Sequence, residues 1–124
     1  MFADTSAVNL TSPSHIGVVV KDRDKTMEFL YSNCGIGPWY TAEASIEKEQ
    51  MIVGQPFRLK IALAKLSGSL LLELLQPVGR SLWSEFLETH GERLHHIAYD
   101  VSNWQEMVSK LEGCGARMMI GAIV

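Results

Sequence analysis

The stretch LHHIAYDV, from Leu94 to Val101, has the composition of a β-strand and contains two adjacent histidines. Its leucine, isoleucine, tyrosine and valine residues favour extended backbone, and no glycine or proline interrupts it. Because successive side chains of a strand point to opposite faces of the sheet, we expect His95 and His96 to point in opposite directions. Only one of them can then face a shared site.

An earlier stretch of the chain repeats the surroundings of His96. HIGVVVKD begins at His15 and HIAYDVSN begins at His96, 81 residues later. Each stretch leads into a segment whose apolar residues recur at helical spacing, and each helix pattern is followed by a Cys-Gly pair. This self-similarity predicts an internal repeat and selects His96, not His95, as the counterpart of His15.

The order of the expected elements supports the repeat. Strand-like runs and helical patterns follow one another as β-α-β-β-β, a linking helix, and then β-α-β. In chain order we expect a strand in 14–22, a helix within 22–35, an extended segment at 36–46, a loop or hairpin at 47–55, strands at 57–66 and 69–77, a helix within 79–91, a strand at 94–101, a helix within 102–115 and a strand from 116.

Capping and turn residues define several of these boundaries. Asp22 and Ser81 are suited to cap the first two helices. Ser102 and Gln105 have the spacing of a capping box at the start of the last helix. The Ser-Gly-Ser sequence at 67–69 separates two apolar runs, as the turn of a hairpin does.

Glu73 lies within a run of leucines, where a carboxylate is costly to bury unless it is paired. One interpretation is an edge strand that exposes Glu73 to water, or a salt bridge from Glu73 to Arg58 or Lys60. The other interpretation combines Glu73 with His15 and His96. Two imidazoles and a carboxylate are suitable ligands for a divalent metal such as Fe, Mn, Co, Ni or Zn, and they leave positions open for substrate.

The overall composition is that of an ordinary soluble domain. The chain has 124 residues, 47% hydrophobic and 20% charged. Its net charge of −3 argues against a nucleic-acid partner, and no apolar run is long enough for a membrane span. Its two cysteines form neither a disulfide framework nor a zinc motif. Residues 1–13 are expected to be a polar leader without signal-peptide features, so we expect a cytoplasmic protein.

Three segments resemble the vicinal oxygen chelate superfamily, which includes glyoxalase I, extradiol dioxygenases, bleomycin-resistance proteins and methylmalonyl-CoA epimerases. The segments are HIGVVVKDRDKTMEFL, SLLLELLQP, and the run from SLWSEFLETHG through LEGCGARMM, which is most similar to the epimerases. The resemblance implies an α+β fold in which paired βαβββ modules form a half-open barrel. The implied divisions of a single domain at 14–124 are module one at 14–77, a linking helix at 81–91, and an incomplete module two at 93–124 that is truncated after βαβ.

The resemblance also implies a site. It places metal ligands at His15, Glu73 and His96, and it implies a divalent metal cofactor (Co, Mn, Ni, Zn or Fe). The family's fourth ligand, a glutamate also implicated in proton transfer, is expected beyond Val124, so the catalytic residues are left unassigned. The implied partners are a small-molecule carbonyl or acyl-CoA substrate and a second copy of the chain in a homodimer.

Several functions remain open within this superfamily. The resemblance favours an epimerase or isomerase that acts on an acyl-CoA such as methylmalonyl-CoA through an enolate. The alternatives are a glyoxalase-type lyase, an extradiol-type dioxygenase, and a protein that binds a small molecule without catalysis, as drug-resistance members do. An inactive member is a further possibility, in which the exposed strand from residue 116 favours dimerisation.

Overall fold

The computed structural model describes residues 10–123. Most of the expected polar leader at 1–13, and Val124, therefore lie outside the described residues. The fold is α+β, as expected. Its elements are β1 (His15–Val19), α1 (Arg23–Cys34), β2 (Trp39–Ile46), a 3-10 turn (Lys48–Gln50), β3 (Met51–Val53), β4 (Phe57–Ser67), β5 (Leu70–Pro77), α2 (Leu82–His90), β6 (Arg93–Ala98), α3 (Trp104–Gly113) and β7 (Gly121–Ala122).

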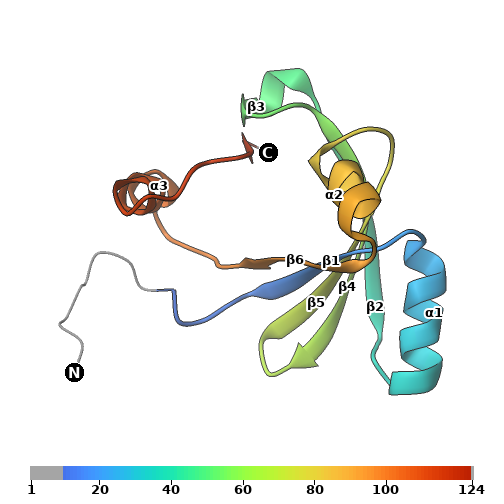
Figure 1. Ribbon diagram of the computed structural model, residues 1–124. Coiled ribbons are helices and arrows are strands. Elements are labelled where there is room, and N and C mark those ends of the chain that lie inside the picture. The colour runs from blue at the N-terminus through green and yellow to red at the C-terminus, as the bar shows by residue number, and fades with distance from the viewer. Residues whose placement is uncertain (1–9, 124) are drawn as a thin grey trace.

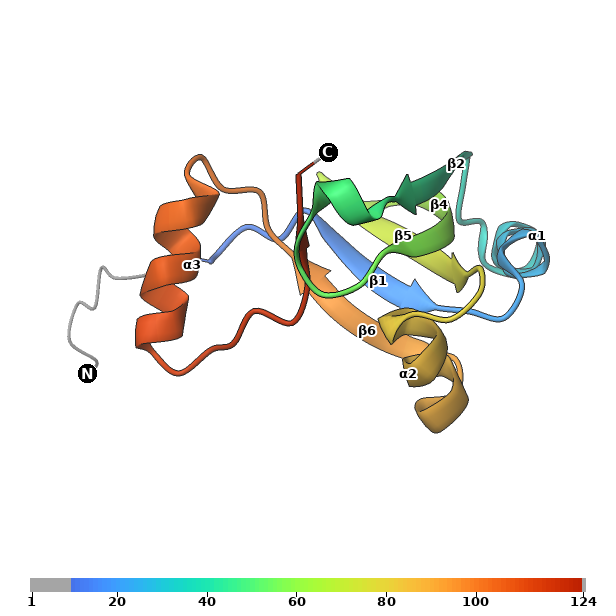
Figure 2. The same ribbon diagram turned by 90° about the horizontal axis from the view of Figure 1, so that it is seen from above.

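Five of the strands form one curved sheet that does not close into a barrel, in the order β2-β4-β5-β1-β6 (Figures 1 and 2). β1 runs parallel to β5 and antiparallel to β6, and β4 is antiparallel to both β2 and β5. The short strands β3 and β7 pair separately. β1 therefore lies between the strand that carries Glu73 and the strand that carries His96.

Helices α1 and α2 pack against opposite faces of this sheet. Val18 and Val20 of the β1 segment pack with Met27 and Leu30 of α1, as the alternation along this strand predicts. Val19, which points the other way, is fully buried in a cluster that includes Trp83 of α2. The face that bears Val19 is also the face expected for His15.

The three helices begin at side-chain caps, but one cap differs from the prediction. The side chains of Asp22 and Ser81 accept the backbone N–H of the third residue beyond them, as expected. In α3 this role belongs to Asn103, so the capping box predicted from Ser102 and Gln105 is wrong. Asparagine is among the best N-cap residues, and α3 begins one residue later than the capping-box spacing indicates.

Two strands are shorter than the sequence predicts. β6 ends at Ala98 rather than at 101, because Ala98 pairs with His15, the first residue of β1, and no further partner follows among the described residues. In the described part of the segment expected to be a strand from residue 116, only Gly121 and Ala122 are in a strand, and they pair with β3 inside the segment expected to be a loop or hairpin. A strand needs a neighbour for its backbone groups, and apolar composition alone does not supply one.

Helix α3 stands apart from the five-stranded sheet in both views (Figures 1 and 2). None of its residues is buried, and Trp104 at its start is 40% exposed. Within the described residues, no helix is long and apolar enough to cross a membrane.

Candidate metal centre

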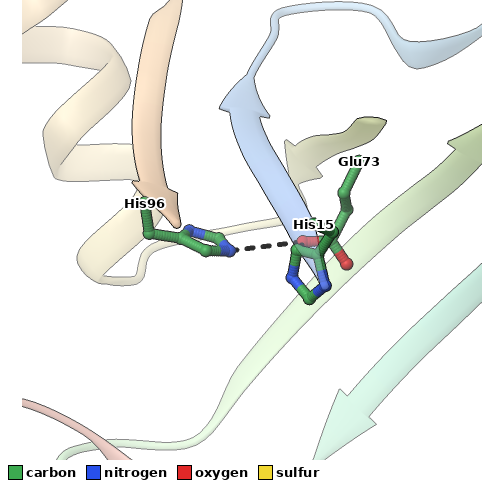
Figure 3. Close-up of side chains that lie close together, drawn as sticks. All are labelled: His15, Glu73 and His96. Carbon is green, nitrogen blue, oxygen red and sulfur yellow. Dashed lines mark ion pairs between the residues drawn. The ribbon is translucent and has the colours of Figure 1, made fainter. Parts of the chain in front are cut away.

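The three ligands proposed from the sequence meet on one face of the sheet. His15 comes from β1, Glu73 from β5 and His96 from β6 (Figure 3). The Nε2 atom of His15 lies 3.2 Å from Oε1 of Glu73, and the Nε2 atom of His96 lies 3.4 Å from the same oxygen. One ligand atom from each residue lies within 4.8 Å of the others. Each side chain thus offers one donor atom to a common point.

Gly17 makes this convergence possible. In the register of the sheet it lies opposite Glu73 on β5 and opposite His96 on β6. A Cβ atom built on Gly17 would overlap the imidazole ring of His96. The ring therefore occupies space that any larger residue in this position would fill. His15, two residues earlier on β1, shares this face of the strand.

A β-bulge places His95 beside His96. Gly17 faces His96 and Val18 faces Leu94, so His95 is an extra residue without a partner on β1. The Nδ1 atoms of His95 and His96 are 2.8 Å apart and share a hydrogen bond. The expectation that the two imidazoles point in opposite directions is therefore wrong, because the bulge interrupts the alternation of the strand.

His95 itself faces α2. Its ring centroid lies 4.7 Å from that of Phe86 and 6.1 Å from that of Trp83. Burial lowers the pKa of His95 below its usual value, and repulsion from His96 lowers that pKa further. Both effects favour the neutral form of the His95 imidazole. His95 thus packs against the helix and makes its hydrogen bond to the next residue along the strand.

His15 also has a neighbour at its second ring nitrogen. The hydroxyl oxygen of Ser14 lies 3.2 Å from Nδ1 of His15, and the same hydroxyl donates to the carbonyl oxygen of Ala98, 3.3 Å away. Because the hydroxyl proton is directed to Ala98, the oxygen is free to accept a proton from Nδ1. This arrangement leaves Nε2 of His15 as the nitrogen that faces Glu73.

The environment of Glu73 fits a cation. Glu73 is only 9% exposed, and its Oε1 atom contacts the Nε2 atoms of both His15 and His96. The alternative salt bridge to Arg58 or Lys60 is therefore wrong. A buried carboxylate needs positive charge or donors nearby, and each contact between its Oε1 atom and a ring nitrogen requires either an Nε2–H that donates to the oxygen or a cation bound by both atoms. A proton or a metal ion must lie among them.

The spacing of the donors also suits a divalent metal. Zinc–nitrogen bonds of about 2.0–2.1 Å in a tetrahedral site separate neighbouring ligand atoms by about 3.4 Å. The separations of 3.2 and 3.4 Å from Oε1 to the two nitrogens are close to that value. The nitrogen and oxygen donors are the kinds that Zn, Mn, Fe, Co and Ni accept. The residues present therefore fit the implied cofactor.

A cavity of about 610 Å³ adjoins the centre. His95 and His96 form part of its wall, and Trp83 and Phe86 of α2 supply aromatic surface. The sequence predicts only that the helix at 81–91 links the two modules, since nothing in its sequence pattern indicates which side of the sheet it covers. A larger cavity, about 830 Å³, lies against α1 on the face that bears Val18 and so is not part of this centre.

Residues 14–124 match the family described as the Glyoxalase/Bleomycin resistance protein/Dioxygenase superfamily, and the chain belongs to this superfamily. The expected resemblance is confirmed at this level. The strands β1, β5 and β6, which carry the three converging side chains, all lie within the matched residues. Among curated proteins, no sequence matches the chain.

Methylmalonyl-CoA epimerases are among the solved structures that the chain resembles. The Streptomyces coelicolor enzyme in complex with 2-nitronate-propionyl-CoA is 28% identical, with 88% of this chain and 75% of that chain covered and a TM-score of 0.68. A methylmalonyl-CoA epimerase in complex with methylmalonyl-CoA and NH4+ is also 28% identical, with 88% of this chain and 73% of that chain covered and a TM-score of 0.68. The Mycobacterium tuberculosis methylmalonyl-CoA epimerase shares the fold. It is 24% identical, with 94% of this chain and 71% of that chain covered and a TM-score of 0.67.

Proposed function

We propose that this chain is a metal-dependent epimerase or isomerase that acts on an acyl-CoA such as methylmalonyl-CoA. The observation that carries the proposal is the convergence of His15, Glu73 and His96 on one point of the sheet. The similarity to methylmalonyl-CoA epimerases, two of which hold acyl-CoA ligands, supports the substrate class.

In this proposal the Nε2 atoms of His15 and His96 and a carboxylate oxygen of Glu73 hold the metal ion. A divalent metal supplies a Lewis acid that polarises the carbonyl oxygen of a thioester and makes the neighbouring carbon more acidic. The cavity beside His96 accepts the acyl group against Trp83 and Phe86. Its volume of about 610 Å³ is sufficient for a small branched acyl group.

Epimerisation also requires that a proton leave one face of the α-carbon and that another return to the opposite face. The three ligands are engaged by the metal and are not free for this role. The proton is therefore removed by an acid–base group other than the three ligands, and a second donor on the opposite face returns one.

The test is proton–deuterium exchange at C2 of methylmalonyl-CoA in heavy water, with the full-length, metal-loaded protein. The proposal predicts exchange by the unaltered chain and none by the His15→Ala and Glu73→Ala variants. Glu43→Ala is the control, because Glu43 is exposed on β2. Absence of exchange with the metal-loaded, unaltered chain would refute the epimerase proposal.

A second candidate function is the binding of a small molecule without catalysis. The apolar cavity beside the centre is the observation that favours it, since this cavity suits a ligand whether or not chemistry follows. Calorimetric titration with methylmalonyl-CoA separates the two candidates. A binding protein keeps its affinity in His15→Ala and His96→Ala and shows no exchange, whereas the enzyme loses exchange in both variants. Glyoxalase-type and dioxygenase-type activities rest on the superfamily alone and have no comparable structural support.

A further inference from the structure

Each imidazole of the centre is hydrogen-bonded by the side chain of the residue that precedes it. Ser14 contacts Nδ1 of His15 at 3.2 Å, and His95 contacts Nδ1 of His96 at 2.8 Å. In both cases the nitrogen that remains, Nε2, faces Glu73. The second contact is the unusual one, because in a regular strand neighbouring side chains point away from each other.

The bulge creates the contact between the two histidines. Without the extra residue in β6, His95 would point to the far face of the sheet, away from His96. Packing against Trp83 and Phe86 then fixes the orientation of the His95 ring. His95 is thus held by α2 on one side and directed at His96 on the other.

The hydrogen bond restricts the tautomers of both rings. Two Nδ1 atoms at 2.8 Å share one proton, so one ring donates and the other accepts. If His95 donates, a neutral His96 carries its proton on Nε2 and cannot ligate a metal through that atom. If His95 accepts, His96 carries its proton on Nδ1 and presents a free lone pair at Nε2, 3.4 Å from Glu73.

We infer that His95 is a positioning residue that accepts the Nδ1–H of His96 and so keeps Nε2 of His96 free and directed toward the metal. The inference rests on the proposed metal centre and deepens it. Metal-bound histidines commonly donate their second N–H to a carboxylate, carbonyl or water, and loss of such a partner typically weakens metal binding by about 10- to 100-fold. Here the Nδ1 atom of His95, 2.8 Å from Nδ1 of His96, takes the place of those acceptors.

Two substitutions separate the hydrogen bond from the packing. His95→Phe keeps an aromatic ring against α2 but removes the acceptor, and His95→Asn restores an acceptor through its amide oxygen. We expect the Zn²⁺ affinity of the metal-free full chain, measured by calorimetry, to fall about 10- to 100-fold in His95→Phe. In His95→Asn we expect the affinity to recover most of this loss. Equal affinity in His95→Phe and the unaltered chain would overturn the inference.

A second readout does not depend on activity. When Zn²⁺ is bound through Nε2 of His96, the proton of His96 lies on Nδ1 and His95 accepts it, so imidazole ¹⁵N NMR of the Zn²⁺-loaded chain should show the proton of His95 on Nε2. Ser14→Ala is the matched control and should leave the tautomer of His95 unchanged. A proton on Nδ1 of His95 in the unaltered, Zn²⁺-loaded chain overturns the inference. A chain that binds no Zn²⁺ overturns both the inference and the proposed function, whereas a Zn²⁺-loaded chain without deuterium exchange overturns the proposed function alone.

Discussion

Gly17 is the residue on which the spacing of the centre depends. It lies between Glu73 and His96 in the register of the sheet, and the ring of His96 covers its Cα atom. The glycine is required for space rather than for an unusual backbone conformation, since its φ lies outside the left-handed range. A side chain at this position would act on the centre by moving His96.

We therefore predict that Gly17→Ala weakens metal binding by about 10- to 100-fold, because the new methyl group displaces the His96 ring. The matched control is Gly113→Ala, where a Cβ atom meets nothing within 4 Å and the backbone is equally ordinary. Calorimetric titration with Zn²⁺ measures both variants. Unchanged affinity in Gly17→Ala would show that His96 is not needed where the structure places it.

At the scale of residues, the sequence predicts the three converging side chains but not their supports. His15 and His96 stand out because they begin related stretches, and Glu73 stands out because it is charged within a run of leucines. The role of His95 could not be predicted. A bulge depends on how β6 pairs with β1, and a period of two along one strand carries no information about that pairing.

Helix α3 is held mainly by its own local interactions. None of its residues is buried, its cap is the side chain of Asn103, and an ion pair joins Lys110 to Glu106 one turn earlier. A helix of 10 residues is marginal by itself, so the cap contributes a large share of its stability. The stability of α3 should therefore respond clearly to loss of the true cap, which distinguishes the observed cap, Asn103, from the predicted one, Ser102.

We predict that Asn103→Ala lowers the opening free energy of α3 by about 1 kcal/mol, because a helix N–H loses its acceptor. Amide hydrogen exchange within α3 should become about fivefold faster. Ser102→Ala is the control and should leave exchange nearly unchanged, since Asn103 provides the side-chain cap. Faster exchange in Ser102→Ala than in Asn103→Ala would support the capping box predicted from the sequence instead.

At the scale of elements, local chemistry predicts the starts of α1 and α2 correctly because a cap lies within the helix's own first turn. Strand ends are predicted less well because they depend on partners far away in the sequence. β6 stops at Ala98 where β1 begins, and β7 is short because its partner, β3, has three residues. Composition identifies where a strand lies, and pairing determines where it ends.

The whole molecule has an open sheet whose β6 edge is available. Within the described residues β6 pairs only with β1, and Leu94 and Ile97 on β6 are each 52% exposed. Exposed strand edges with apolar side chains favour association with another chain. This supports the homodimer expected from the sequence, which stays a prediction.

If β6 forms the dimer contact, Ile97→Lys should shift the chain toward monomer, because a buried ammonium group is costly at an apolar interface. Sedimentation velocity over a range of concentrations measures this shift. Lys65→Ala, an exposed change near the end of β4, should leave the association unchanged. A monomeric unaltered chain at all concentrations would contradict the prediction of a homodimer.

The central claim is that His15, Glu73 and His96 together hold one divalent metal ion. Its most direct test is the metal content of the full-length protein, measured by inductively coupled plasma mass spectrometry after loading with Zn²⁺, Co²⁺, Mn²⁺, Ni²⁺ or Fe²⁺ and removal of free ion. We predict about one ion per chain for the unaltered protein and for His90→Ala, a control on the exposed end of α2. We predict none for His15→Ala, Glu73→Ala or His96→Ala. Failure of the unaltered chain to retain any of these metals, or full retention by the three variants, would contradict the account.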